Sequence, residues 1–282
     1  MPESVVALTI AGSDPSGGAG LQADLKTFSA LGVYGAAVVT ALTAQNTRGV
    51  QGVQLIEPDF LRLQLASVFD DLPVTVVKTG MLGNAAIIGA VADVLEEQLD
   101  KTHELRVVID PVMVARGGDV LLDPKAVGVL RERLLPLASV VTPNRREAAL
   151  LTGTAEAEDV DSLRRSARAL FELLGQRPVL VKGGSALQGA LDLLIDGHGE
   201  EFPLAIAGAP IVTRSTHGAG CTLSAALAAF LGLGHALREA SAGAKQYVYG
   251  AIEHAPGLGG GNGPIAHDWM RRIGPDTRVR PS

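Results

Sequence analysis

Hydrophobic residues follow two alternating patterns along the chain, and together these patterns predict its fold class. Short runs that are apolar throughout predict buried strands at Val5–Ala11, Ala36–Thr43, Val74–Lys78, Arg106–Asp110, Ser139–Thr142 and Pro178–Lys182. Longer segments with apolar residues at helical spacing predict helices at Gly20–Leu31, Asp59–Asp70, Asn84–Leu99, Pro124–Leu134 and Val160–Leu174. Buried strands that alternate with amphipathic helices are typical of an α/β fold, with a mostly parallel sheet covered on both faces.

The pattern changes after Lys182. Short strand-like segments predict antiparallel edge strands at Ala190–Asp196, Glu201–Ala205 and Ile211–Thr213. Two further helices are expected near Ala219–Leu231 and Ala236–His254. Because no linker or repeat interrupts the chain, we predict a single domain over residues 1–270, followed by a mobile C-terminal tail over residues 271–282.

Composition narrows the class of protein. Of the 282 residues, 47% are hydrophobic, which supports a large buried core and excludes intrinsic disorder. The net charge of -6 has the wrong sign for a general nucleic-acid-binding protein. A single cysteine excludes an internal disulfide and a multi-cysteine zinc site, and it suits a reducing compartment. We therefore expect a cytoplasmic protein without a nucleic-acid partner.

The uncharged stretch between Arg214 and Arg238 raises the alternative of a membrane-spanning helix, which needs roughly 20 apolar residues. Polar and glycine residues occupy the first half of this stretch, and Gly232 and Gly234 lie near its end. The composition favours a loop that enters a buried helix. The first residues also lack the basic segment of a secretory signal, so we expect no membrane partner.

A glycine-rich loop, Gly12–Gly20, follows the first strand and leads into a helix. Ligands of open α/β sheets bind beyond the carboxyl ends of the strands, where such a loop lets backbone approach a ligand closely. The stretch Gly18–Ala23 fits the dinucleotide pattern G-x-G-x-x-A, but it lies too far from the strand, and no acid ends the second strand. This excludes a dehydrogenase and leaves a binding loop or a flexible connection as equal alternatives.

Several other predicted strand ends carry residues suited to phosphate and metal chemistry. Asp110 and Glu147 follow two strands on the same rim, and Mg²⁺ commonly takes one or two carboxylates plus substrate phosphates. The spacing Asn144-x-x-Glu147 also fits a helix capping box, which needs no ion. Lys182 ends a further strand beside two glycines, where it can meet phosphate oxygens or extend to water.

The segment Ser215–Thr222, which precedes an uncharged helix, is the most informative one. Gly218 and Gly220 allow consecutive backbone amides to point the same way, so that they form an anion-binding site at the helix N-terminus. Cys221 then lies in the first helical turn, where the helix dipole is expected to lower the pKa of its thiol. His217 is either a substrate gate or a polar loop residue.

Several enzyme motifs are absent from the sequence. It contains no G-x-x-x-x-G-K-[ST] P-loop, no H-E-x-x-H zinc motif and no G-x-S-x-G nucleophile elbow. The residues alone therefore indicate phosphate chemistry from two glycine loops and a carboxylate rim, without identifying a substrate.

Seven segments, in order, resemble the ribokinase-like superfamily and, more closely, the bacterial hydroxymethylpyrimidine/phosphomethylpyrimidine kinases of thiamin biosynthesis. They are Ala7–Gly35, Thr43–Gly49, Lys78–Leu82, Asp110–Met113, Thr142–Asn144, Val181–Gly184 and Thr216–Thr222. The resemblance covers nearly the whole chain. It implies a single-domain ribokinase-like fold, a homodimer, and ATP-dependent phosphorylation of an aminopyrimidine alcohol and then of its monophosphate.

The resemblance also implies roles for individual residues. The substrate pocket would contain Gln45, which holds the pyrimidine edge, together with Asp24, Gly12, Ala19 and Met81. Asp110 and Glu147 would organise Mg²⁺, while Lys182, Asn144 and Thr216 would contact ATP. The backbone amides of Gly218, Ala219, Gly220 and Cys221 would stabilise the transferred phosphoryl group. Cys221 stands where the wider superfamily usually has an aspartate base, so we hypothesise that its thiolate accepts the substrate hydroxyl proton.

Two alternative functions remain, and two residues differ from the pattern of the family. A pyridoxal kinase of the same superfamily is the nearest alternative, which Gln45 and the absence of a lid cysteine at Ala115 oppose. A non-catalytic binding protein on this scaffold would have lost Asp110, Lys182 or Cys221, yet all three are present. Ser185 and Asn262 stand where relatives often have histidine, so no histidine role transfers to them.

Overall fold

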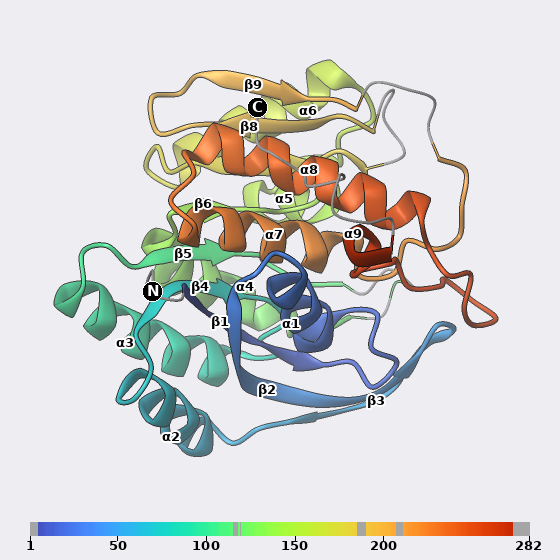
Figure 1. Cartoon of the computed structure of the whole chain (residues 1–282). Helices are drawn as coiled ribbons and strands as arrows, with labels where there is room; N and C mark the ends of the chain where they lie inside the picture. The colour runs from blue at the N-terminus through green and yellow to red at the C-terminus, as the bar shows by residue number, and fades with distance from the viewer. Residues whose placement is uncertain (1–4, 115–117, 119, 185–189, 207–210, 273–282) are drawn as a thin grey trace.

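A single mixed sheet organises the chain (Figure 1). The computed structural model describes residues 5–114, 118, 120–184, 190–206 and 211–272. Within them, nine strands pair in the order β3-β2-β1-β4-β5-β6-β7-β8-β9. The strands are β1 (Val6–Ser13), β2 (Tyr34–Asn46), β3 (Gly49–Leu55), β4 (Val74–Thr79), β5 (Arg106–Ile109), β6 (Val140–Val141), β7 (Val179–Lys182), β8 (Asp192–Ile195) and β9 (Glu201–Leu204).

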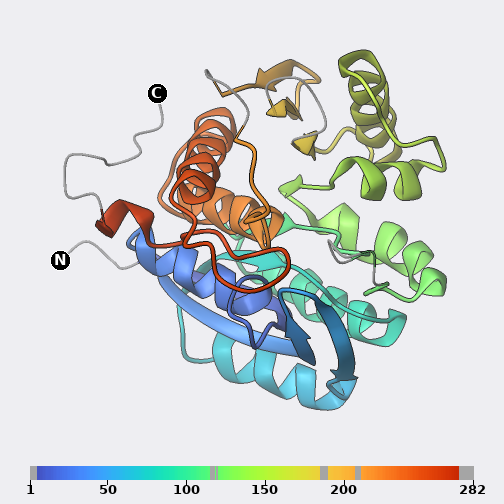
Figure 2. The ribbon, with the colours of Figure 1, turned by 90° about the vertical axis from the view of Figure 1, so that its right-hand side faces the viewer.

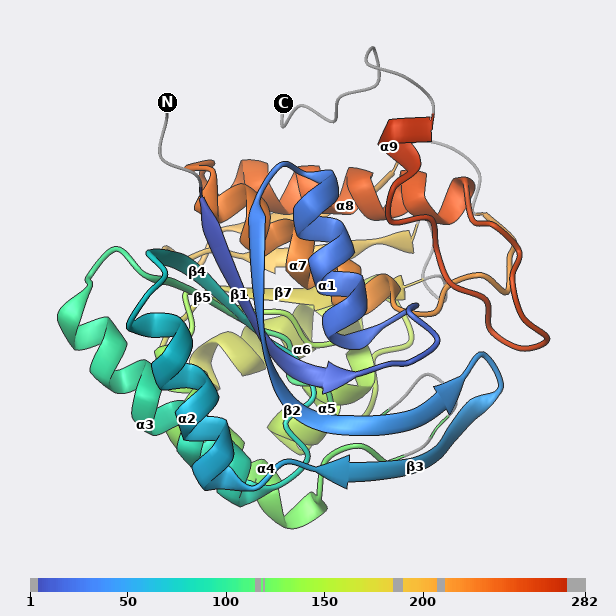
Figure 3. The same cartoon turned by 60° about the horizontal axis from the view of Figure 1, so that its bottom comes forward.

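Six neighbouring strands, from β2 across β1 to β7, run parallel, as the apolar runs predicted. Strands β8 and β9 add the predicted antiparallel edge, whereas Ile211–Thr213 forms no strand. At the opposite edge β2 continues past the expected Thr43 and pairs antiparallel with β3 as a curved two-stranded arm (Figure 3). The arm was not predicted, because β3 is mostly exposed and has no one-sided apolar pattern.

Helices cover both faces of the sheet (Figure 2). Helices α1 (Gly20–Ala30), α7 (Ala219–Gly232) and α8 (Leu237–Glu253) lie on one face. The other face carries α2 (Pro58–Phe69), α3 (Ala85–Lys101), α5 (Arg145–Thr152) and α6 (Val160–Leu173). Side chains of β1 alternate between the two sides: Ala7 packs in the core under α7, whereas Leu8 and Ile10 pack in the core under α3. Burial on both faces therefore explains why this strand is apolar throughout.

One helical prediction and the predicted domain boundary differ in detail from the structure. The segment expected as one helix at Pro124–Leu134 is helical throughout but irregular, because it changes between 3-10, α and π geometry: η1 (Pro124–Ala126), α4 (Val127–Val129), η2 (Leu130–Leu134) and η3 (Leu135–Leu137). Pro136 lies just beyond the predicted helix, in the last of these turns, where proline prevents a regular helix from continuing. A short helix, α9 (Trp269–Arg272), crosses the boundary expected at residue 270, and its Arg271 donates a 2.9 Å hydrogen bond to the carbonyl of Ser29.

The described compact part of the chain therefore continues through Arg271. The rest of the expected tail, residues 273–282, lies outside the described residues, as do Ala115 and Ser185. No helix in the part of the chain that is described combines the length and apolar character needed to cross a membrane.

Candidate active site

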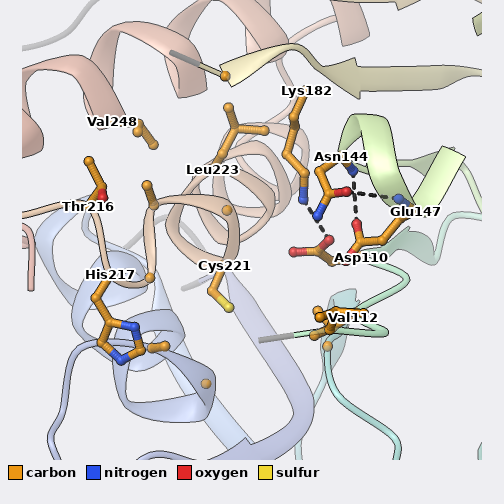
Figure 4. Close-up of a pocket in the computed structure, with 18 of the residues that line it drawn as sticks. Asp110, Val112, Asn144, Glu147, Lys182, Thr216, His217, Cys221, Leu223 and Val248 are labelled. Carbon is orange, nitrogen blue, oxygen red and sulfur yellow. Dashed lines mark hydrogen bonds and ion pairs between the residues drawn. The ribbon is translucent and has the colours of Figure 1, made fainter. Parts of the chain in front are cut away.

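A cavity of about 680 Å³ opens at the carboxyl ends of the parallel strands. Both glycine-rich loops contribute to it, and so do the ends of β2, β4, β5 and β7. Figure 4 shows the second glycine loop, with Cys221, facing a group formed by Asp110, Asn144, Glu147 and Lys182. The cavity therefore joins the segments that the sequence placed at one rim of the sheet.

The first glycine loop is fixed by the carboxylate of Asp14. Asp14 Oδ2 accepts the N–H of Ala19 at 2.8 Å, and Oδ1 accepts both the N–H and the hydroxyl of Ser16. Gly12 and Ala19 line the cavity, and a Cβ on Gly12 would lie 3.1 Å from Met81 Sδ. This loop is therefore an ordered wall of the cavity rather than a flexible connection.

The second glycine loop brings the start of α7 to the same cavity. Gly218 precedes the helix with φ of +80°, a left-handed conformation that glycine adopts without strain. The N–H of Ala219 donates to the carbonyl of Thr216 at 3.2 Å. Those of Gly220 and Cys221 have no intrahelical acceptor, because they belong to the first turn. Of the four amides predicted to bind an anion, that of Ala219 is therefore engaged by Thr216, whereas those of Gly220 and Cys221 stay available to a ligand.

Lys182 lies directly beside this turn. Its Nζ donates to Asp110 Oδ1 at 2.7 Å, and a Cβ on Gly220 would be 3.4 Å from the same Nζ. Asp110 Oδ2 accepts the hydroxyl of Ser224, which α7 contributes, at 3.0 Å. The ammonium and the free amides of α7 therefore face one region, where they can bind an anion together.

Asn144 and Glu147 form the capping box that their spacing predicted. Asn144 Oδ1 accepts the N–H of Glu147 at 2.8 Å, and Glu147 Oε2 accepts the N–H of Asn144 at 2.8 Å. Both residues also line the cavity. Burial raises the pKa of Glu147 to about 7; the charge of Lys182 opposes this shift, and the charge of Asp110 adds to it. Capping and a role at the cavity are therefore compatible.

The carboxylates of Asp110 and Glu147 were expected to organise Mg²⁺. Within the described ranges, no three His, Cys, Asp or Glu side chains gather closely enough to hold a metal by themselves. Two carboxylates nevertheless fit Mg²⁺, which usually keeps several waters and takes further oxygens from substrate phosphates. The donor set suits an ion that arrives with a nucleotide.

Cys221 differs from expectation in its protonation. It lies in the first turn of α7, and the N–H of Gly20, at the start of α1, donates to its sulfur. Burial nevertheless raises the pKa of the Cys221 thiol to about 11, and the charges of Asp24 and Asp110 add to this, although Lys78 opposes it. The prediction that the helix dipole lowers this pKa is therefore wrong, since desolvation outweighs the dipole.

Asp24 is the one expected pocket residue that does not line the cavity. It is completely buried between α1 and the sheet, where Lys78 Nζ contacts its two carboxylate oxygens at 3.0 and 2.8 Å. The hydroxyl of Thr9 donates to Asp24 Oδ2 at 2.6 Å. The carboxylate of Asp24 therefore binds only to partners inside the protein, and Lys78 rather than Asp24 lines the cavity.

The remaining expected residues all line the cavity: Gln45, Met81, Thr216 and the residue left open, His217. Met81 is only 8% exposed, so it both fills the core and forms cavity wall. Asn262 is not among the lining residues, and its N–H donates to the carbonyl of Thr47 at 2.8 Å.

Four buried charged residues that line the cavity were missed by the sequence analysis: Asp14, Lys78, Asp192 and Lys245. Lys78 carried the signal used for Lys182, a lysine at the end of a buried parallel strand. Asp192 and Lys245 form an ion pair at 2.7 Å between β8 and α8, and no local motif connects these positions.

Solved structures of a pyridoxal kinase and of a phosphomethylpyrimidine kinase superpose on this sheet and on the helices that cover it, which places the fold in the ribokinase-like class of small-molecule kinases. The family model for phosphomethylpyrimidine kinase matches residues 14–266. The chain belongs to the phosphomethylpyrimidine kinase family.

Individual relatives agree with this placement. The chain is 51% identical to the hydroxymethylpyrimidine/phosphomethylpyrimidine kinase of Rhizobium meliloti, over 94% of this chain and 97% of that protein. It is 52% identical to the thiamine biosynthesis bifunctional protein ThiED of Geobacter sulfurreducens, over 92% of this chain but only 51% of that longer protein. Among solved structures, an ADP complex of Bacillus subtilis pyridoxal kinase superposes with a TM-score of 0.85 at 41% identity, covering 95% of this chain and 99% of that one.

Proposed function

We propose that this kinase transfers the γ-phosphoryl group of ATP to the hydroxymethyl group of 4-amino-5-hydroxymethyl-2-methylpyrimidine, and then a second one to the resulting monophosphate. One observation carries the proposal: Gln45 and the start of α7 line the same cavity as the Lys182–Asp110 pair. An acceptor alcohol bound at Gln45 and a phosphoryl donor bound at Lys182 would therefore lie in the same cavity.

The chain's own residues act mainly by position and charge. The amide of Gln45 offers a donor and an acceptor to the pyrimidine edge, and Met81 contacts the ring face. Asn144, Lys182 and Thr216 hold the nucleotide, while the free amides of Gly220 and Cys221 stabilise charge on the transferred group. The bond from the γ-phosphorus to the bridging oxygen breaks as the bond to the substrate oxygen forms.

The substrate hydroxyl loses its proton during transfer. Cys221 is the group proposed to accept it as a thiolate, after its thiol has released its own proton to solvent. Because its pKa is raised to about 11, the thiol is mostly protonated before substrates bind. A loose phosphoryl-transfer transition state needs little help from a base, so positioning supplies most of the acceleration. Asp110 and Glu147 would hold Mg²⁺, which supplies charge neutralisation of the phosphate oxygens when it is bound.

Phosphorylation of pyridoxal is the alternative activity, and the similarity to the Bacillus subtilis pyridoxal kinase favours testing it. Purified protein with ATP and Mg²⁺ is to be offered hydroxymethylpyrimidine, its monophosphate and pyridoxal. We expect kcat/KM to be highest for the two pyrimidines. Turnover of pyridoxal alone would contradict the proposal, and Lys182→Met serves as the inactive control.

Three further properties belong to the proposal. The enzyme acts in the cytoplasm, assembles as a homodimer, and consists of one kinase domain followed by a short C-terminal tail. Sedimentation of the purified chain measures the dimer directly, and removal of residues 273–282 without loss of turnover is the expected result for a dispensable tail.

A further inference from the structure

His217, whose role the sequence left open, joins the two glycine loops beside Gln45. Its Nε2 lies 2.7 Å from Asp14 Oδ2, in the first loop, and 3.4 Å from Gln45 Nε2. The side chains of His217 and Asp14 are 12% and 3% exposed, so water competes little for this contact. Figure 4 shows the His217 ring apart from the Lys182–Asp110 group.

The direction of the hydrogen bond between His217 and Asp14 follows from the other partners of the carboxylate. Asp14 accepts three further hydrogen bonds, from the N–H of Ala19 and from the N–H and hydroxyl of Ser16. Burial alone would raise the pKa of Asp14, but the hydrogen bonds from His217 and Ser16 outweigh it and hold that pKa at about 2. An ionised carboxylate only accepts, so Nε2 of His217 carries a proton and donates it.

The other end of the Gln45 amide faces Thr43, whose Oγ1 lies 3.4 Å from Gln45 Oε1. The single hydroxyl proton of Thr43 is already donated to the carbonyl of Ser13 at 2.8 Å. Towards Gln45, Thr43 is therefore an acceptor. The proton of His217 Nε2 goes mainly to Asp14, so the recorded orientation sets the Gln45 NH₂ against an N–H at 3.4 Å and its Oε1 against the acceptor Thr43. A half-turn of the amide removes both like-with-like contacts, because it places Oε1 towards the N–H of His217 and Nε2 towards Thr43.

We propose that Asp14 and His217 are positioning residues that fix the amide orientation of Gln45, and that this orientation sets acceptor specificity. The inference rests on the proposed function. With the amide fixed, its acceptor lies on the His217 side and its donor on the Thr43 side. An aminopyrimidine edge then binds one way round, with its exocyclic amine towards His217 and its ring nitrogen towards Thr43. A ring that lacks the amine leaves Oε1 without a donor from the substrate.

The first test measures the protonated nitrogen of His217 in the ligand-free protein by 15N NMR, with His217→Ala used to assign the signal. A proton on Nε2 is expected. A His217 protonated only on Nδ1 would overturn the proposal, whatever the activity of the enzyme. The measurement does not depend on turnover. If the proposed function fails, seen as no turnover of either pyrimidine, the proton on His217 can still be located, so the two failures are distinguishable.

The second test compares hydroxymethylpyrimidine with its analogue lacking the exocyclic amine. We expect the wild type to lose at least about 100-fold in kcat/KM on the analogue, because an unpaired polar group penalises the incomplete substrate. In His217→Ala and in Thr43→Val, where the amide is free to turn, the loss should fall below about tenfold. The exposed His103→Ala is the matched control and should retain the wild-type ratio. Variants that slow both substrates equally would show a merely structural role and would overturn the proposal.

Discussion

The carbonyl oxygen of Gly18 occupies the space that a side chain on Gly218 would need. The two residues come from loops 200 positions apart in the chain, and this close approach brings the first glycine loop against the start of α7. In the proposed reaction the first loop borders the acceptor and the start of α7 receives the phosphoryl group. The contact therefore keeps the two reacting groups in one cavity.

Gly218→Ala is expected to separate these loops. The added Cβ overlaps the Gly18 carbonyl, and φ of +80° further disfavours alanine. We expect kcat/KM to fall by at least about 100-fold, since small misplacements of reacting groups have large effects on rate. Gly234→Ala is the matched control, because Gly234 has φ of +89° but nothing within 4 Å of an added Cβ. It should lose about 1 kcal/mol of stability and keep its activity; equal activity losses in both variants would contradict the role of the contact.

The ion pair between Asp24 and Lys78 should matter for stability, although Lys78 also lines the cavity. Both side chains are fully buried, so Lys78→Met leaves an unpaired carboxylate and should cost about 3–5 kcal/mol in the free energy of unfolding. The double variant Asp24→Leu with Lys78→Met should recover most of this loss. Urea denaturation measures both values. Arg62→Ala, which breaks an exposed pair with Asp93, should cost less than about 1 kcal/mol. A double variant no more stable than Lys78→Met would contradict this view.

Most of the fold followed from the hydrophobic pattern, because buried parallel strands and amphipathic helices leave strong local signals. The β2–β3 arm did not, since its residues are exposed and no one-sided apolar pattern marks it. The placement of Asp110 and Lys182 at one rim of the sheet was also predictable, because the carboxyl ends of parallel strands lie at the same edge.

Residues that depend on distant partners were not predictable. Asp24 looked like a pocket residue until the structure showed its carboxylate turned towards Lys78 on a neighbouring element. The protonation of Cys221 also depends on tertiary burial, which a local dipole argument does not include. Asp14 serves the site through His217, 203 positions later in the chain, and no spacing rule connects them.

His267 should make the stability of the protein sensitive to acid. Burial lowers the pKa of His267 to about 4, and its Nε2 has no hydrogen-bond partner among the described residues. Between pH 6.5 and 4 the unfolded chain therefore binds a proton more readily than the folded one, and stability falls as the pH falls. From pH 7 to 5 this group should account for about 2 kcal/mol. His267→Gln should lose correspondingly less stability over that interval in urea denaturation, whereas the exposed His103→Gln should behave like the wild type. An identical pH response in all three proteins would refute the assignment.

Cys221 offers the sharpest test of what the thiol does, because it is the only cysteine in the chain. Since its pKa is raised to about 11, the thiolate fraction at pH 7 is small and should grow about tenfold per pH unit. Alkylation by iodoacetamide should therefore accelerate steadily from pH 7 to pH 10, and Cys221→Ser should not be labelled. A rate that levels off near pH 8 would show that an activated thiolate exists before substrates bind.

The Cys221→Ala variant separates the two proposed roles of this residue. Turnover within a few-fold of the wild type would refute proton acceptance by the sulfur. It would leave phosphoryl stabilisation by the backbone amides intact.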